Sequence, residues 1–294
     1  RDRRRNRVGG LGSGGSCLAG GARGSEPALA GFDFQVAPQT MELMREMVGN
    51  GEVDHLVAER VWQEVSRGLM EATPSRMLQT LRECGALSRI MPEVDALFGV
   101  PQPAAHHPEI DTGAHILMVI DYAARQGYPL PARFAALTHD LGKGATPREH
   151  WPQHIGHEEK SVQLLEALCL RLRVPADCRD LAVLVARYHG TVHRAQELRP
   201  GTVLKLLSEV DVFRRPERFE AFLAACAADF FGRVGDPRAD YPPMRFFGAC
   251  AAAARSIDTG FIAGRADGPA AISAAIEAAR LNAITETLAS LRRE

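Results

Sequence analysis

The sequence predicts an all-α protein, and three observations support this prediction. Apolar residues recur at helical spacing along almost the whole chain after residue 32. Strict alternation of apolar and polar residues is nearly absent, and proline and glycine bound the apolar segments. The 294 residues are 46% hydrophobic and 24% charged, so the chain is long enough and apolar enough to bury a sizeable core.

The first 31 residues differ from the rest of the chain. Five arginines precede a glycine-rich stretch over residues 9–24 that has little apolar periodicity. Such a segment buries too little surface to offset its chain entropy, so we expect a disordered basic tail. It could be an RNA-binding arm, a tail without a function or an artefact of translation. Because the chain opens on arginine, we also expect it to be a fragment.

Helices are expected in order from residue 38 onward. Pro38 opens the first, which Gly51 closes, and apolar residues at a spacing of four predict the second over 59–69. Thr73 is expected to cap the third, with proline at its first helical position and Gly85 after its end. A proline-rich connection over 93–108 precedes further helices at about 115–126, 131–141, 156–173, 176–189, 200–210, 216–232, 244–260 and 269–293.

The pair His139-Asp140 ends an apolar run, which predicts a buried carboxylate. A buried carboxylate needs a partner, and a cation is the economical one. His115 opens the preceding helix, and Asp229 lies among alanines and phenylalanines. These four residues are therefore the predicted metal ligands. Two imidazoles and two carboxylates suit manganese, nickel, cobalt, iron or magnesium with open coordination positions; the alternative for each histidine alone is a hydrogen-bonded core residue.

The order of these residues, with His157 and His189 between the pair and Asp229, resembles the HD phosphohydrolase superfamily. In members with five histidines, residues at these two places bind a second metal or contact phosphate. The resemblance thus implies catalytic roles for His157 and His189 beside the pair; the alternative is histidines favoured by helix ends. Lys143 follows the pair on the loop side, where its ammonium could meet phosphate, or it is a solvated lysine.

The remaining histidines are expected to be less important. His154 and His193 are placed at the periphery of the cluster, and Asp111 is a candidate to orient His115. No role is expected for His55, His106, His107 and His150.

Longer strings extend the resemblance. Residues 92–101, 107–113, 139–144 (HDLGKG) and 151–158 (WPQHIGHE) are similar to the bacterial multifunctional CCA protein family, and the similarity covers residues 32–260. In that family a head domain adds C, C and A to the tRNA 3′ end, and an HD domain has metal-dependent phosphatase and 2′,3′-cyclic phosphodiesterase activities. The resemblance implies neck and body helices over 32–108, and an HD domain with C-terminal helices over 109–294.

The motifs of the nucleotidyltransferase head (GGxVRD, DxD and EDxxR) do not occur in residues 1–294. Two carboxylates are needed to hold the metal ions of nucleotidyl transfer, so we expect no CTP or ATP site and no nucleotide addition here. The leading hypothesis is a phosphohydrolase that uses a divalent metal, with nickel or magnesium favoured. The alternatives are an inactive tRNA-binding or dimerisation module, and an HD nucleotidase.

Charge and hydropathy limit the partners. The net charge of −1 excludes a uniformly basic nucleic-acid binder. One basic stretch could follow a tRNA backbone, or it is a solvated surface of mixed charge; it contains Arg194, Arg199, Lys205, Arg214, Arg215 and Arg218. We expect the tRNA 3′ end as a partner and leave a homodimer open. The sequence shows no signal peptide and no apolar run of about 20 residues. We therefore expect a cytoplasmic location and no membrane association.

Overall fold

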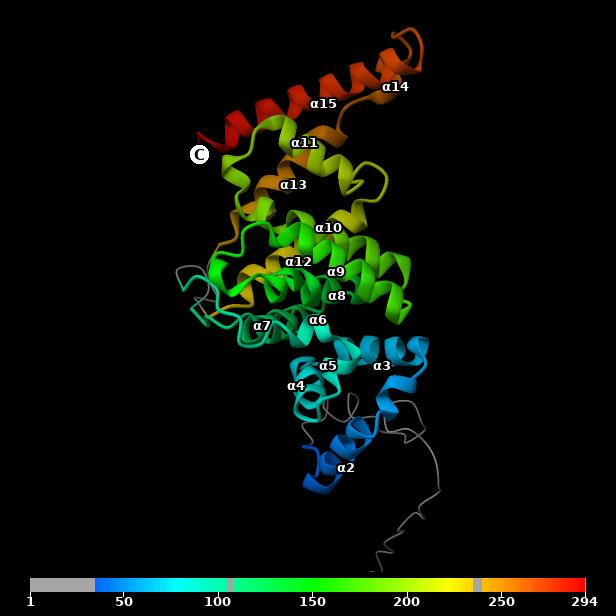
Figure 1. Ribbon diagram of the computed structural model, residues 1–294. Coiled ribbons are helices and arrows are strands. Elements are labelled where there is room, and N and C mark those ends of the chain that lie inside the picture. Colours follow the sequence, from blue (N-terminus) through cyan, green and yellow to red (C-terminus); the bar gives the residue numbers. More distant parts are fainter. Residues whose placement is uncertain (1–34, 105–107, 235–239, 294) are drawn as a thin grey trace, which may run out of the picture.

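The computed structural model describes residues 35–104, 108–234 and 240–293. Over these ranges the chain forms helices and turns, and its only β pairing is one bridge between Pro101 and Asp111. The all-α prediction is confirmed. The predicted tail, residues 1–31, lies outside the described residues. Helix α2 lies at one end of the molecule and α15 at the other, with α7 to α10 and α12 between them (Figure 1).

The N-terminal helices are short. They are α2 (Pro38–Gly49), the 3-10 turn η1 (Glu52–His55), α3 (Ala58–Met70), α4 (Ser75–Glu83), α5 (Leu87–Ile90) and α6 (Pro92–Asp95). Helices α2, α3 and α4 lie close to their predicted ranges, while η1, α5 and α6 were not predicted and α6 lies at the start of the segment expected to be a connection. The apolar stripe of α3 is buried and packs against α8 (Leu130–Thr138), where Trp62 meets Phe134 edge to face at 5.2 Å. These helices therefore share a core with the helices that follow.

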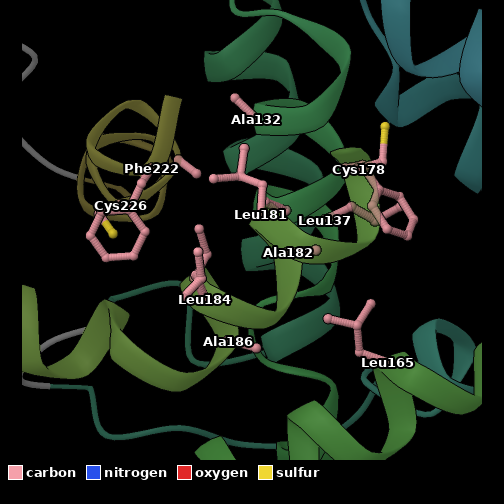
Figure 2. Packing of buried hydrophobic residues seen from close by; sticks show 14 of the residues in the cluster. Ala132, Leu137, Leu165, Cys178, Leu181, Ala182, Leu184, Ala186, Phe222 and Cys226 are labelled. Carbon is pink, nitrogen blue, oxygen red and sulfur yellow. The ribbon is translucent and has the colours of Figure 1, made fainter. Parts of the chain in front are cut away.

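Helix α8 is the centre of the molecule. It packs against α3, α7 (Thr112–Arg125), α10 (Ala176–His193) and α12 (Pro216–Phe231). Every residue of α8 from 132 to 138 is buried; most are apolar, and the guanidinium of Arg133 is satisfied by the backbone carbonyls of Leu69 and Tyr128. Figure 2 shows the surrounding core, with Leu181 and Leu184 of α10 near Phe222 of α12. The helix that carries the HD pair at its end is thus held on all sides.

The C-terminal part consists of α11 (Pro200–Glu209), α13 (Pro242–Arg255), α14 (Thr259–Ala263) and α15 (Pro269–Leu291). Helix α15 packs on α11 and α13 and buries only Ile284 and Leu288 of its own residues. No helix in the described ranges has both the length and the apolar character needed to cross a membrane.

Several helix ends differ from the prediction; α7 begins at Thr112 where 115 was expected, and α13 ends at Arg255 where 260 was expected. Helix α8 ends at Thr138, so His139 caps it instead of lying within it. Helix α10 continues past the predicted end at His189 through Gly190 to His193. Glycine costs about 1 kcal/mol in a helix interior, but tertiary packing overrides this preference. The extension adds one turn that carries His193.

The cap predicted for α4 is wrong. Pro74, not Thr73, is the N-cap residue, and no side chain of its own segment caps the helix. Instead, Asp121 of α7 accepts hydrogen bonds from the backbone N–H of Ser75 at 3.0 Å and from its hydroxyl at 2.7 Å. A cap from another helix leaves no local sequence signal, which explains the error.

Gly142 lies where the 3-10 turn η2 (Leu141–Ala145) meets the start of α9 (His157–Leu172). Its N–H donates to the hydroxyl of Ser161 at 2.8 Å. A Cβ atom at this position would lie 2.1 Å from the carbonyl oxygen of His157 and 2.7 Å from the backbone nitrogen of Ser161. Both are backbone atoms that cannot move aside, so only glycine permits this approach.

We expect Gly142→Ala to lower the free energy of unfolding by about 1–3 kcal/mol or more, because an added methyl group forces the backbone apart. Urea denaturation followed by circular dichroism measures this change. The matched control is Gly201→Ala in α11, where nothing lies within 4 Å of the new Cβ atom. Equal stability of the two variants would contradict the tight contact.

Candidate metal centre

The His139–Asp140 pair lies between the end of α8 and the start of η2. Both side chains are buried. The Nδ1 atom of His139 hydrogen-bonds to the carbonyl oxygen of Ala136 at 2.8 Å. A carbonyl accepts only, so Nδ1 donates a proton here and Nε2 faces the carboxylates of Asp140 and Asp229.

The structure brings the four predicted metal ligands together. His115 comes from α7 and Asp229 from α12, and their Nε2 and Oδ1 atoms lie 3.0 Å apart. The Nε2 atom of His139 lies 3.1 Å from Asp140 Oδ2 and 3.5 Å from Asp229 Oδ1. All four residues are buried.

These donor atoms have a spacing that suits a divalent cation. Octahedral ligands with bonds of about 2.1 Å place adjacent donors about 3 Å apart. Neither contact of His139 Nε2 has hydrogen-bond geometry, so this buried nitrogen has no hydrogen-bond partner. A buried polar atom without a partner is costly, and two imidazoles with two carboxylates form a common donor set for transition metals. The residues therefore fit such an ion.

A second group of donors shares Asp140. Its Oδ1 atom lies 3.1 Å from His157 Nε2 and 3.4 Å from His189 Nε2. The Nδ1 atoms of these histidines bond to the backbone carbonyls of His154, at 2.8 Å, and Val185, at 2.9 Å. Both Nε2 atoms are thus turned towards Asp140, and this group also has donor spacing that could hold a metal ion.

The charges of the cluster follow from its contacts. Burial raises the pKa of Asp140, but the Lys143 ammonium and His139 outweigh it and hold the pKa well below its usual range. Burial alone would lower the pKa of His139, yet Asp140 and Asp229 raise it to about 10. Asp229 keeps a low pKa because His139 and His193 outweigh its burial. Both carboxylates are ionised, and a bound cation could replace imidazole protons in neutralising them.

Lys143 lies inside the cluster. Its Nζ atom is 2.6 Å from Asp140 Oδ2 and donates to Gln102 Oε1 at 2.8 Å. The residue is 7% exposed, so it is not a solvated loop lysine. Its ammonium is held at the edge of the donor cluster.

Glu109, not Asp111, accompanies His115. The Oε1 atom of Glu109 lies 2.9 Å from His115 Nδ1, and both side chains are buried. Asp111 instead accepts from the backbone N–H groups of Gly99 and Ala114, which caps α7. Glu109 stands in an irregular segment without apolar periodicity, so no sequence pattern indicated it.

His193 lies in the cluster, although the sequence placed it at the periphery. Its Nε2 atom is 2.6 Å from Asp229 Oδ2, on the side of the carboxylate away from His115. The missed signal was helical spacing, because His193 follows His189 by one turn if α10 does not stop at Gly190. His154 is buried and bonds through Nε2 to the carbonyl oxygen of Pro101 at 2.7 Å, a structural role.

A pocket of about 550 Å³ opens beside the donor cluster. Its wall includes Lys143, His157 and Asp229, so a ligand in the pocket reaches the cluster directly. Arg194 and Arg233 also line it and bring positive charge to the entrance. The volume is in the range of small-molecule sites.

The other predicted RNA-binding residues do not line this pocket. Lys205 lines a groove between α11 and α15, and Arg218 lines a depression beside α9 and α10. Arg214 and Arg215 contact Asp211 at 2.9 and 3.7 Å, while Arg199 is an exposed N-cap residue of α11. The basic stretch is therefore distributed over several surfaces.

Two family models match this chain. Residues 33–98 match the family described as the probable RNA and SrmB-binding site of polymerase A. Residues 112–215 match the HD domain, which contains His115, the His139–Asp140 pair and the second donor group. Residues 112–215, which include α7 to α11, thus form an HD domain, and the segment that matches the RNA-binding family precedes it.

Curated relatives extend this match. The multifunctional CCA protein of Nitrosospira multiformis is 64% identical over 234 residues, which are 80% of this chain and 57% of that protein. The protein of the same name from Nitrosomonas europaea is 56% identical over 270 residues, 89% of this chain and 66% of the relative. The chain spans about three fifths of the length of these relatives. On this evidence the chain belongs to the multifunctional CCA protein family, as the resemblance in its sequence indicated.

Proposed function

We propose that this chain is a metal-dependent phosphohydrolase that cleaves phosphomonoesters and 2′,3′-cyclic phosphates at RNA 3′ ends. The observation that carries the proposal is the convergence of His115, His139, Asp140 and Asp229. Their donor atoms meet at 3.0–3.5 Å in a buried cluster beside an open pocket. Phosphate esters are the substrates for which such a centre is suited.

The four ligands would hold the cation, and nickel or magnesium is our leading choice. A bound divalent cation lowers the pKa of a coordinated water and offsets the charge of a phosphoryl group. Lys143 and His157 line the pocket beside this centre, where a cationic side chain stabilises the negative charge that develops on phosphate. His189 would position Asp140, because its Nε2 atom lies 3.4 Å from the Oδ1 oxygen of that carboxylate.

The tRNA 3′ end is the proposed RNA partner. The N-terminal helices, residues 32–108, would act as the neck and body of a CCA protein and contact tRNA, which the RNA-binding family match supports. Since the nucleotidyltransferase motifs do not occur in residues 1–294, we assign these residues hydrolysis and no CTP or ATP site. A cytoplasmic location completes the proposal, which leaves the oligomeric state open.

Replacement of the HD pair tests the chemistry. We expect His139→Ala and Asp140→Ala each to reduce metal-stimulated hydrolysis of 2′,3′-cyclic AMP by at least 100-fold, because each removes a ligand of the centre. Chromatography of the AMP product measures the rate. The control is His55→Ala, an exposed histidine of η1. Wild-type rates in both cluster variants would exclude the mechanism.

Removal of the metal should destabilise the protein. A ligand that binds only the folded state stabilises it, by about 2.7 kcal/mol at 100 times Kd. We expect NiCl₂ to raise the Tm of EDTA-treated protein by several degrees, and Asp229→Asn to abolish most of this rise. Thermal denaturation with Asp267→Asn as the exposed control checks this. An unchanged rise in Asp229→Asn would exclude Asp229 as a ligand.

The basic stretch gives a third prediction. We expect Arg194→Ala with Arg199→Ala to weaken tRNA binding at low salt and to reduce the salt dependence of the affinity by about one ion per arginine. Filter binding over a series of KCl concentrations measures both quantities. Arg255→Ala, an exposed arginine at the end of α13, is the control. An unaltered salt dependence would remove these residues from the RNA surface.

A further inference from the structure

A chain of hydrogen bonds leads from α13 to the metal centre. The hydroxyl of Tyr241, the N-cap residue of α13, lies 2.9 Å from His193 Nδ1. The Nε2 atom of His193, at the end of α10, lies 2.6 Å from Asp229 Oδ2. Asp229 Oδ1 is the oxygen that faces His115 and His139. Three helices therefore meet in one row of polar atoms.

The proton positions in this row follow from the chemistry of its members. An ionised carboxylate only accepts, so His193 Nε2 must donate to Asp229. The other ring nitrogen of His193, Nδ1, bonds to the hydroxyl of Tyr241, so both edges of the imidazole are held. Burial raises the pKa of Tyr241, so its hydroxyl keeps its proton. The row thus links the Tyr241 hydroxyl to the Asp229 carboxylate through one fixed imidazole.

The Tyr241 ring is itself held in place. Its centroid lies 4.7 Å from that of Phe230 and 6.0 Å from that of Phe231, both on the helix that carries Asp229. The residue is 5% exposed. Aromatic packing of this kind fixes the direction of the hydroxyl, so the donor at the start of the row is preorganised.

We propose that Tyr241 and His193 are positioning residues that fix the Asp229 carboxylate for metal binding, with Oδ2 occupied by His193 and Oδ1 left for the cation. This inference rests on the metal centre proposed above. The histidine ligands are already oriented through their Nδ1 atoms by backbone carbonyls or, for His115, by Glu109. The hydrogen-bonded row from Tyr241 through His193 to Asp229, which we call the relay, gives the aspartate ligand the same support. Partners of this kind contribute about 10–100-fold to metal affinity.

The test is calorimetric titration of the full chain with NiCl₂ after removal of bound metal. We expect Tyr241→Phe to weaken nickel binding about tenfold, because His193 loses the hydrogen-bond partner that holds its ring in place. His193→Ala should weaken binding by a similar or larger factor. His193→Gln should recover part of the loss, because its side-chain amide can donate to Asp229. The matched control is Tyr128→Phe, a half-buried tyrosine in the same domain that should leave the affinity unchanged.

Each outcome has a distinct meaning. Weaker binding in Tyr241→Phe and His193→Ala, with partial recovery in His193→Gln and unchanged Tm without metal, supports the relay. Wild-type nickel affinity in both Tyr241→Phe and His193→Ala overturns the relay but leaves the metal centre intact. If the wild-type chain binds no nickel, manganese or magnesium, the metal centre fails and the relay fails with it. Loss of affinity in Tyr128→Phe to the same extent would also overturn the relay.

Discussion

Two ionised carboxylates in an apolar interior impose the main constraint on this structure. A buried charge without compensation costs several kcal/mol, so each oxygen of Asp140 and Asp229 needs a positive or hydrogen-donating neighbour. The chain supplies these neighbours from separate helices: Lys143 and His139 lie on one side of Asp140, and His157 lies on the other.

One central helix provides the framework for these neighbours. Helix α8 is buried from residue 132 to residue 138 and packs against α3, α7, α10 and α12, so its end, with the HD pair, is held at a fixed depth. Gly142 then allows η2 to approach the start of α9, which brings His157 towards Asp140. A site built on packed helices and one glycine contact keeps its geometry better than a site on loops.

The sequence was sufficient to predict most of the helices and four candidate metal ligands that the fold brings together, for different reasons. Apolar periodicity and proline or glycine boundaries reveal helices, while the order of the histidines and aspartates carries a family pattern. Local patterns fail where a tertiary contact decides. Asp121 caps α4 from another helix, and packing carries α10 through Gly190.

The residues around the ligands were harder to predict than the ligands themselves. Glu109 lies in a segment without periodicity, and His193 was placed at the periphery because the helix was expected to end one turn early. The basic stretch looked continuous along the chain, but folding distributes Lys205 and Arg218 over different surfaces. Proximity in sequence says little about a shared face once several helices separate the residues.

Helix α10 has a mechanical consequence for both donor groups. His189 and His193 are one turn apart and project from the same side of the helix, the former to Asp140 and the latter to Asp229. A small axial rotation or slide of α10 would therefore displace an imidazole from each carboxylate at the same moment. The two donor groups are therefore coupled through one rigid helix, and a movement of α10 cannot change one group without changing the other.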